Sequence, residues 1–239
     1  MRILVANVNT TETMTEGIAE AARAVASAGT EIVPITPDFG AESCEGNFES
    51  YLAAIAVMDA VVRHDGEYDA VIQAGYGEHG REGLQELLTV PVVDITEAAA
   101  STAMYLGRSY SVVTTLDRTV PLIEDRLIVA GLHDRCASVR SSGMSVLELE
   151  SEPDRAIEAI VAEAKRAVEE DRAEVIVLGC GGMAELKDRV VERCGVPVVD
   201  GVQAAVAVAE GLVQLGLKTS KVRTYAPPRP KRVTGFPSR

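Results

Sequence analysis

The chain has 239 residues, of which 47% are hydrophobic, and it carries a formal net charge of −13. This length is enough for two lobes that each enclose a core, whereas the negative charge argues against nucleic-acid partners, because these need a basic face. Aromatic residues make up only 4% of the chain and tryptophan is absent, which also argues against stacking platforms for single-stranded nucleic acids.

The chain begins with a short apolar segment that favours a first strand over a targeting sequence. Residues 1–7 read Met-Arg-Ile-Leu-Val-Ala-Asn, which is too short for the apolar core of a signal peptide. No apolar run approaches the roughly 20 residues that a membrane-spanning helix needs. The cysteines are scattered without a CxxC pair. We therefore expect a cytoplasmic protein with reduced thiols and no membrane partner.

Apolar runs alternate with helical patterns along the whole chain, which predicts βαβ units and parallel sheets. We expect strands at residues 2–8, 31–36, 69–74, 90–95, 109–115, 136–141, 174–179 and 196–200. We expect helices at residues 11–28, 47–64, 80–88, 96–106, 118–130, 152–171, 183–194 and 201–216. The two halves match from end to end, and right-handed crossovers make each half a small doubly wound sheet.

The predicted fold is therefore α/β, with two pseudo-symmetric lobes, each built on a four-stranded parallel sheet. Residues 1–98 together with 201–239 would form the N-terminal lobe, and residues 99–200 the C-terminal lobe. Ligands bind outside the carboxyl ends of such strands. The active site is therefore expected in the cleft between the lobes.

One stretch of the chain is nearly repeated, and the two copies differ at an informative position. Asp69-Ala-Val-Ile-Gln-Ala-Gly75-Tyr-Gly77 precedes Val90-Pro-Val-Val-Asp94, and Glu174-Val-Ile-Val-Leu-Gly-Cys180-Gly-Gly182 precedes Val196-Pro-Val-Val-Asp200. Each copy predicts a strand, a glycine-rich turn, a short helix and a second strand. At the matched position one turn has Cys180 and the other has Gly75. The two turns are expected to face each other across the cleft.

Cys180 is the strongest candidate for a chemical role. It follows a buried strand and precedes a helix expected to begin near Met183, so backbone N–H groups and the helix dipole should lower the pKa of its thiol. Gly181 and Gly182 let the backbone approach a ligand closely, and this suits a developing enolate. A cysteine that only fills space is the alternative. Cys136 and Cys194 fit that description.

The first turn offers polar residues and a formal dinucleotide motif. Glu78 and His79 follow it directly, and either is a candidate general base or simply polar cover for a helix start. Gly75-x-Gly77-x-x-Gly80 matches the dinucleotide pattern, but it lies on the third strand. Asp94, at the position of the ribose-binding acid, also has a twin in Asp200, so a repeated strand-end role explains it. No His, Asp or Glu group has metal-ligand spacing.

Several motifs, taken together, resemble those of the aspartate/glutamate/hydantoin racemase superfamily, closest to its hydantoin and allantoin racemase branch. The resemblance covers essentially the whole chain. The motifs are Asn7-Val-Asn9-Thr-Thr11, Glu45-Gly46-Asn-Phe48, Pro91-Val-Val-Asp-Ile-Thr-Glu97-Ala-Ala, Thr114-Thr115-Leu, Leu178-Gly-Cys180-Gly-Gly-Met183, and Leu215-Gly-Leu-Lys-Thr-Ser-Lys221 with Tyr225.

The resemblance implies cofactor-independent proton transfer at a carbon next to a carbonyl, in a small amino-acid derivative or a cyclic ureide such as a hydantoin or allantoin. Two cysteines normally flank that carbon. Cys180 matches one of them, and Gly75 stands where the family has the other. Arylmalonate decarboxylases of the same superfamily also have one cysteine and a glycine, so a decarboxylase of a malonate-like substrate is an alternative. A catalytically silent binding homologue is another.

On this interpretation Cys180 is the catalytic acid and base, and Tyr76, Glu78 or His79 supplies the second proton site. The backbone of the neighbouring glycines would bind the enolate oxygen, and polar residues at other strand ends would hold the substrate. These groups are Gly77, Gly181 and Gly182 for the enolate, and Asn9, Thr10, Thr114 and Thr115 for the substrate. No metal or cofactor is expected.

The last part of the chain is basic. From Lys218 to Arg239 there are seven Lys or Arg residues and no acidic residue. We expect this arm to pack on the acidic body of its own chain or on a neighbouring subunit, with nucleic-acid contact as the alternative. The family resemblance implies a homo-oligomer, a dimer or larger.

The origin of the glycine pattern can be tested directly. Because the repeat explains the pattern without a nucleotide, we expect the purified protein to show no binding of NAD or NADP in isothermal calorimetry at concentrations that saturate ordinary dehydrogenases. Micromolar binding of either nucleotide would contradict the racemase interpretation.

Overall fold

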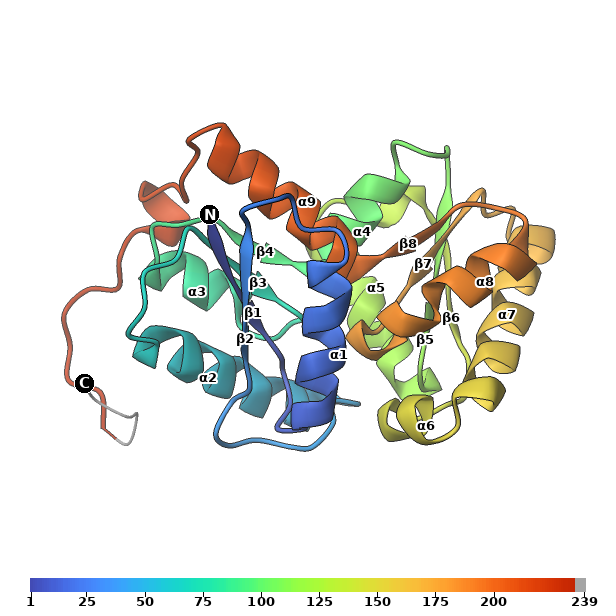
Figure 1. The fold of residues 1–239 in the computed structure, drawn as a ribbon, viewed down its shortest axis with the longest axis horizontal. Helices are drawn as coiled ribbons and strands as arrows, with labels where there is room; N and C mark the ends of the chain where they lie inside the picture. The colour runs from blue at the N-terminus through green and yellow to red at the C-terminus, as the bar shows by residue number, and fades with distance from the viewer. Residues whose placement is uncertain (235–239) are drawn as a thin grey trace.

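The computed structural model describes residues 1–234, apart from the side chain of Glu185, and consists of two α/β lobes side by side (Figure 1). Each lobe contains a four-stranded sheet, with the strand orders β2-β1-β3-β4 and β6-β5-β7-β8, and all neighbouring strands are parallel. The predicted fold is therefore confirmed. The last five residues of the predicted N-terminal lobe and of its basic tail lie outside the described residues.

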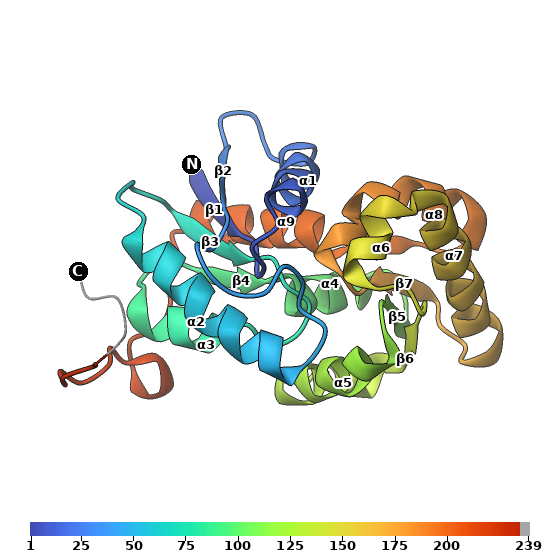
Figure 2. The same cartoon turned by 90° about the horizontal axis from the view of Figure 1, so that it is seen from below.

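The first lobe alternates strands and helices. Its elements are β1 Arg2–Ala6, α1 Glu12–Arg23, β2 Glu31–Ile35, α2 Asn47–Arg63, β3 Ala70–Gln73, α3 Arg81–Leu87, β4 Val92–Asp94 and α4 Ile95–Ala103. Its sheet lies between α1 and α9 on one face and α2 and α3 on the other (Figure 2).

The second half of the chain repeats this order, although its last helix, α9, packs on β3 and β4 of the first sheet. Its elements are β5 Tyr110–Thr114, α5 Val120–Val129, β6 Cys136–Ser141, α6 Val146–Ser151, α7 Pro153–Glu170, β7 Val175–Leu178, α8 Lys187–Cys194, β8 Val198–Asp200 and α9 Gly201–Gln214. Short 3₁₀ turns occur at Asp117–Thr119, His133–Arg135, Gly181–Leu186 and Arg223–Tyr225.

Two of the predicted helices have clearly different bounds in the structure, and one further helix was not predicted. The helix expected at 11–28 ends at Arg23, and beyond it the N–H and hydroxyl of Ser27 both donate to Glu210 of α9. The helix expected at 183–194 begins as the 3₁₀ turn, so its α-helical part starts only at Lys187. Helix α6 was not predicted, although Ser145 and Glu148 form a capping box at its start, which is a recognisable sequence signal.

The lobes meet along α4 and α9, which pack against each other. Asp94 caps α4 by accepting from the N–H of Glu97 at 2.8 Å, and Asp200 caps α9 by accepting from the N–H of Gln203 at the same distance. This identical capping confirms the repeated strand-end role of the two aspartates. Residues of both lobes share one hydrophobic cluster, which includes Ile3 and Val175.

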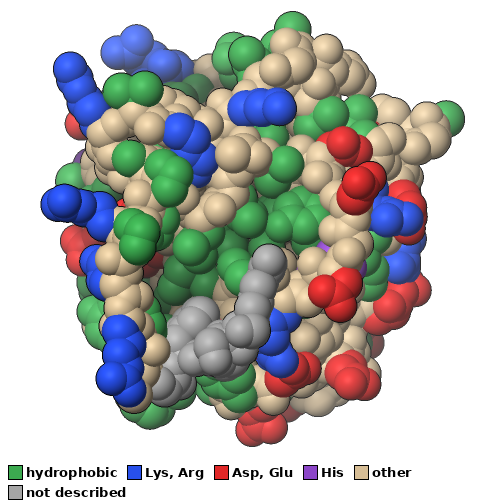
Figure 3. Space-filling model, turned by 90° about the vertical axis from the view of Figure 1, so that its left-hand side faces the viewer, with side chains coloured by type: hydrophobic (Ala, Val, Ile, Leu, Met, Phe, Trp, Pro, Cys, Tyr) green, Lys and Arg blue, Asp and Glu red, His purple; other side chains and the backbone are tan. Residues whose placement is uncertain are grey.

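The first part of the tail, around Thr219 and Lys221, packs on the N-terminal lobe. The hydroxyl of Thr219 donates to the carbonyl of Val90 at 2.7 Å, and the ammonium of Lys221 donates to carbonyls at the end of α3. Figure 3 shows this side of the molecule, on which apolar side chains gather in a hollow bordered by Lys and Arg side chains. Within the described residues, no helix has the length and apolar character needed to cross a membrane.

Gly201 is expected to be essential for the contact between the lobes. A Cβ atom at this position would lie 2.8 Å from the carbonyl oxygen of Ile95, so Gly201→Ala should lower the free energy of unfolding by about 1–3 kcal/mol through overpacking. Urea denaturation measures the change. Gly211→Ala on the same helix is the control, because a Cβ there meets nothing within 4 Å. It should stabilise the protein by about 0.5–1 kcal/mol. Equal effects of the two substitutions would contradict this view of the junction.

Candidate active site

A cleft between the lobes brings together the carboxyl ends of strands from both sheets. About 510 Å³ of space in and above it, open solvent included, is free of protein atoms. It is lined by Asn7, Val8, Asn9, Met14, Ile18, Cys44, Ala74, Gly75, Tyr76, His79, Thr114, Thr115, Thr119, Val146, Gly179, Cys180, Gly181 and Gly182. The two matched turns therefore face one space, as the repeat predicted.

Cys180 lies at the end of β7, at the start of the 3₁₀ turn, and is partly exposed to the cleft. Burial raises the pKa of its thiol to about 11, and the N–H groups of Gly182 and Met183 lower the pKa only in part. The expected lowering of this pKa is therefore wrong, because the desolvation of a thiolate in this cleft outweighs the turn dipoles. At neutral pH Cys180 is a thiol that can donate a proton.

Gly75 has no space for a side chain in this structure. A Cβ atom there would overlap the ring of His79 and would lie 2.5 Å from a methyl group of Val8 and 2.7 Å from Nε2 of Gln73. The side-chain amide of Gln73 also donates to the carbonyl of Gly75 at 3.0 Å. The imidazole of His79 thus fills the place that a side chain at the matched position would occupy.

Tyr76 and His79 are the two candidates for the second proton site that line the cleft. The hydroxyl of Tyr76 is buried and has no hydrogen-bond partner among the described residues. Burial raises its pKa well above the usual value. His79 is buried, and this desolvation lowers its pKa to about 4, so the imidazole is neutral at pH 7. Neither group is poised to exchange a proton near neutrality.

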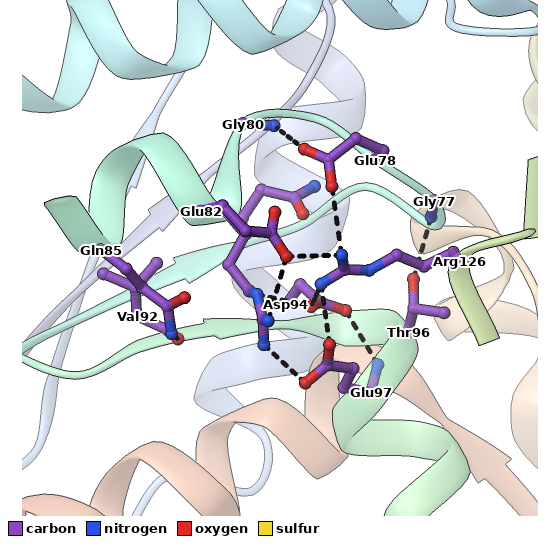
Figure 4. A network of polar contacts seen from close by, with 12 residues as sticks. Gly77, Glu78, Gly80, Glu82, Gln85, Val92, Asp94, Thr96, Glu97 and Arg126 are labelled. Carbon is purple, nitrogen blue, oxygen red and sulfur yellow. Dashed lines mark hydrogen bonds and ion pairs between the residues drawn. The ribbon is translucent and has the colours of Figure 1, made fainter. Parts of the chain in front are cut away.

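Glu78 lies on the same turn, and its carboxylate points toward Arg126 (Figure 4). One carboxylate oxygen accepts from the N–H of Gly80 at 2.8 Å, and the other accepts from Arg126 at 3.1 Å. Burial and the neighbouring Glu82 raise its pKa to about 6. The side chain is 49% exposed and lies in a neighbouring hollow with Asn47 and Arg126 rather than in the cleft.

Most of the predicted substrate-binding residues line the cleft. The amide nitrogen of Asn9 donates only to the thioether of Met14, at 3.4 Å, among the described residues, so it is available to a ligand. Thr114 and Thr115 lie opposite, on the second lobe. Thr10 is not among the lining residues, because its hydroxyl and its N–H both donate to the carbonyl of Ala41.

Of the three glycines predicted to bind the enolate oxygen, two line the cleft and one does not. Gly181 and Gly182 line the cleft, and a Cβ atom at Gly181 would lie 2.9 Å from the carbonyl oxygen of Ala74. The N–H of Gly77 donates to the hydroxyl of Thr96 at 2.9 Å. The expectation that Gly77 binds an enolate oxygen is therefore wrong for this arrangement, since its donor is already engaged.

The sequence did not single out the loop that closes the cleft. The thiol of Cys44 lines the cleft and donates to the carbonyl of Val8 at 3.2 Å. Its neighbour Glu45 accepts from the N–H of Val146, the first residue of α6, at 2.8 Å. This bond bridges the lobes at the edge of the cleft. The motif that begins at Glu45 was the available signal, but its role depends on α6, which was not predicted.

Asp94 and the charged residues around it leave little freedom for a nucleotide. Asp94 is buried, caps α4 and accepts from Arg126 at 2.8 Å. It is therefore engaged within the protein and is not directed at a ribose. Within the part of the chain that the structure describes, no group of three His, Cys, Asp or Glu residues is placed to hold a metal ion.

The chain matches known proteins over its full length. The model of the Asp/Glu/Hydantoin racemase family matches residues 3–209. A hydantoin racemase from Pseudomonas sp. (strain NS671) is 42% identical over 236 residues, which are 98% of this chain and 95% of that protein. The crystal structure of an allantoin racemase from Pseudomonas fluorescens is 75% identical, covers 98% of this chain and 100% of that one, and has a TM-score of 0.97. An allantoin racemase from Klebsiella pneumoniae is 41% identical, covers 98% and 96%, and has a TM-score of 0.94.

The packing of His79 over Gly75 makes a quantitative prediction. Gly75→Ala should lower the free energy of unfolding by about 1–3 kcal/mol, because the new methyl group has no space. The cost should be smaller by about 0.5 kcal/mol or more when His79→Ala is already present, since the ring is then gone. A double-mutant cycle by urea denaturation measures this coupling.

Gly182→Ala is the matched control for the cycle. A Cβ at Gly182 would make only ordinary contacts at 3.7 Å, so its cost should be small and independent of His79. If Gly75→Ala costs the same with and without the ring, His79 does not occupy the missing side chain's place.

Proposed function

The chain belongs to the Asp/Glu/hydantoin racemase family, and we propose that within it this enzyme racemises allantoin or a closely related substituted hydantoin. The observation that carries this proposal is the lining of the cleft. Amides and hydroxyls from Asn9, Thr114 and Thr115 surround Cys180, and the cleft's lining, as far as it is described, includes no Lys or Arg. Such groups suit the donors and acceptors of a neutral cyclic ureide.

The same lining disfavours the decarboxylase alternative. A malonate-like substrate carries two carboxylates, and binding these ions away from water requires paired charges or several strong donors. Free amino acids with acidic side chains meet the same difficulty. The cleft offers such a substrate mainly the N–H groups of the turn after Cys180. A neutral ureide needs only one developing charge to be stabilised, namely that of the enolate oxygen.

Racemisation requires an acid and a base on opposite faces of the α-carbon. Cys180 supplies the acid on one face, because its thiol remains protonated at neutral pH. When a base on the other face removes the α-proton, the C–H electron pair moves into an enolate. The N–H groups of Gly181 and Gly182, on the turn that lines the cleft, would stabilise its oxygen. Transfer of the thiol proton to carbon then gives the opposite enantiomer, and the reverse direction uses the same groups with exchanged proton states.

We propose Glu78 as the second proton site. A general base works best when its pKa lies near the working pH, and the pKa of Glu78, about 6, is closer to neutrality than that of His79, about 4. Glu78 would have to swing into the cleft from its present position. Gly77 and Gly80 flank it with φ values of 122° and 91°, and glycine is the residue that tolerates such turns.

The two proton sites can be separated by hydrogen exchange. Each enantiomer of allantoin is incubated in D₂O, and α-proton loss and optical rotation are followed by NMR and polarimetry. Cys180→Ser and Glu78→Gln should each reduce racemisation by about 100-fold or more, as expected for loss of a general acid or base. Glu78→Gln should leave only exchange on the face that Cys180 covers. Activity should also fall as the pH decreases through about 6, because Glu78 becomes protonated.

Cys194→Ser and His79→Gln serve as controls for a buried thiol and for the alternative base. Cys194 lies in α8 and is not among the cleft residues, so its replacement should leave turnover unchanged. Full activity of Glu78→Gln together with loss of activity in His79→Gln would assign the second site to His79. Full activity of Cys180→Ser, or no turnover of any hydantoin, would defeat the proposal.

A further inference from the structure

Arg126 connects the second lobe to the turn that carries Glu78. It lies on α5, and its side chain is only 3% exposed. Its Nη1 donates to Glu78 at 3.1 Å and to Glu82 at 2.6 Å. Its Nη2 donates to Asp94 and to Glu97, both at 2.8 Å. One buried guanidinium of the second lobe thus reaches four carboxylates that belong to the segment from β3 to α4 (Figure 4).

The charges of this cluster do not balance. Arg81 is the second cation, and it pairs with Glu82 at 3.1 Å, Asp94 at 3.4 Å and Glu97 at 2.5 Å. Four carboxylates therefore face two guanidinium groups. Arg81 makes no ion pair with Glu78 among the described residues, so the charge of Glu78 is stabilised there by Arg126 and by the N–H of Gly80.

Charged groups on α3 and α5 shift the pKa of Glu78 in opposite directions. Glu82 of α3 disfavours the ionised form of Glu78 and raises its pKa, whereas Arg126 lowers it. Asp125 of α5 lines the same hollow, and α2 contributes only neutral groups, Asn47, Ser50 and Tyr51. An opposite charge at this distance typically changes a carboxyl pKa by about 1–3 units. Arg126 is the cation that pairs with Glu78 among the described residues, so its removal should raise the pKa of Glu78.

We propose that Arg126 is a positioning residue for the racemisation: it holds the Glu78 carboxylate ionised at its resting position beside the cleft, through a contact that exists only when the two lobes are docked. This inference rests on the proposed role of Glu78 as the second proton site. It adds a link between the lobes and that site. Arg126 does not line the cleft and would act through Glu78 alone.

The test compares pH profiles of Arg126→Gln and Arg81→Gln in the full-length enzyme. Both substitutions remove one cation from the same cluster, and both should lower the thermal midpoint. Only Arg126→Gln should move the ascending limb of kcat/KM, which reports the free enzyme, to higher pH by about one unit or more, for the enantiomer whose proton Glu78 removes. Activity lost at pH 7 should therefore return at higher pH. Arg81→Gln should leave the limb in place.

Arg126→Lys covers the case in which Arg126→Gln does not fold. It keeps one positive charge, so the ascending limb of its pH profile should move in the same direction by a smaller amount. The proposal would be overturned if the ascending limb of the pH profile stays in place in the Arg126 variants. It would also be overturned if that limb shifts equally in Arg81→Gln.

The Glu78→Gln variant separates this inference from the proposed function. If Glu78→Gln is inactive but substitution of Arg126 does not shift the ascending limb of the pH profile, only the proposed role of Arg126 fails. If Glu78→Gln racemises normally, the assignment of the second proton site fails and the role of Arg126 fails with it.

Discussion

The close approach of the two lobes determines where the other functional features lie. Gly181 lies against the carbonyl of Ala74, and Gly201 lies against the carbonyl of Ile95. At both places the backbone of one lobe occupies the space that a side chain of the other would need. The two glycine-rich turns are consequently held on either side of one small space. A ligand there is in reach of strand ends from both sheets, and neither lobe alone encloses such a site.

Within this symmetrical frame the chemistry is asymmetrical. The matched turns have the same backbone plan, but one presents a thiol and the other a glycine that is covered by His79. The first turn thus differs from the second in several residues: Gly75 has no side chain, the imidazole of His79 fills the volume beside it, and Glu78, the proposed second proton site, has a raised pKa. A thiol and a carboxylate differ in acidity, so the two proton states that racemisation needs are not equally populated at rest.

Much of the fold could be predicted because the signal is repeated. Two copies of the same strand, turn and strand pattern gave consistent information on the sheets, on the capping role of Asp94 and Asp200, and on the position of Cys180. What depends on distant contacts could not be predicted. The raised pKa of Cys180 results from burial by both lobes, the N–H of Gly77 is engaged by a residue of α4, and the four partners of Arg126 become neighbours only in the assembled structure.

The position of Glu78 beside an open hollow has an isotopic consequence. Its carboxyl is about half exposed there, so on the proposed mechanism a hydron that it takes from the substrate would be replaced by one from the solvent between turnovers. Cys180 lines the cleft, where a bound substrate would separate it from water. A hydron on sulfur can therefore return to the carbon from which it came. The enantiomer that Glu78 deprotonates would therefore exchange its α-hydrogen with solvent, whereas the enantiomer that Cys180 deprotonates would regain part of its own hydrogen.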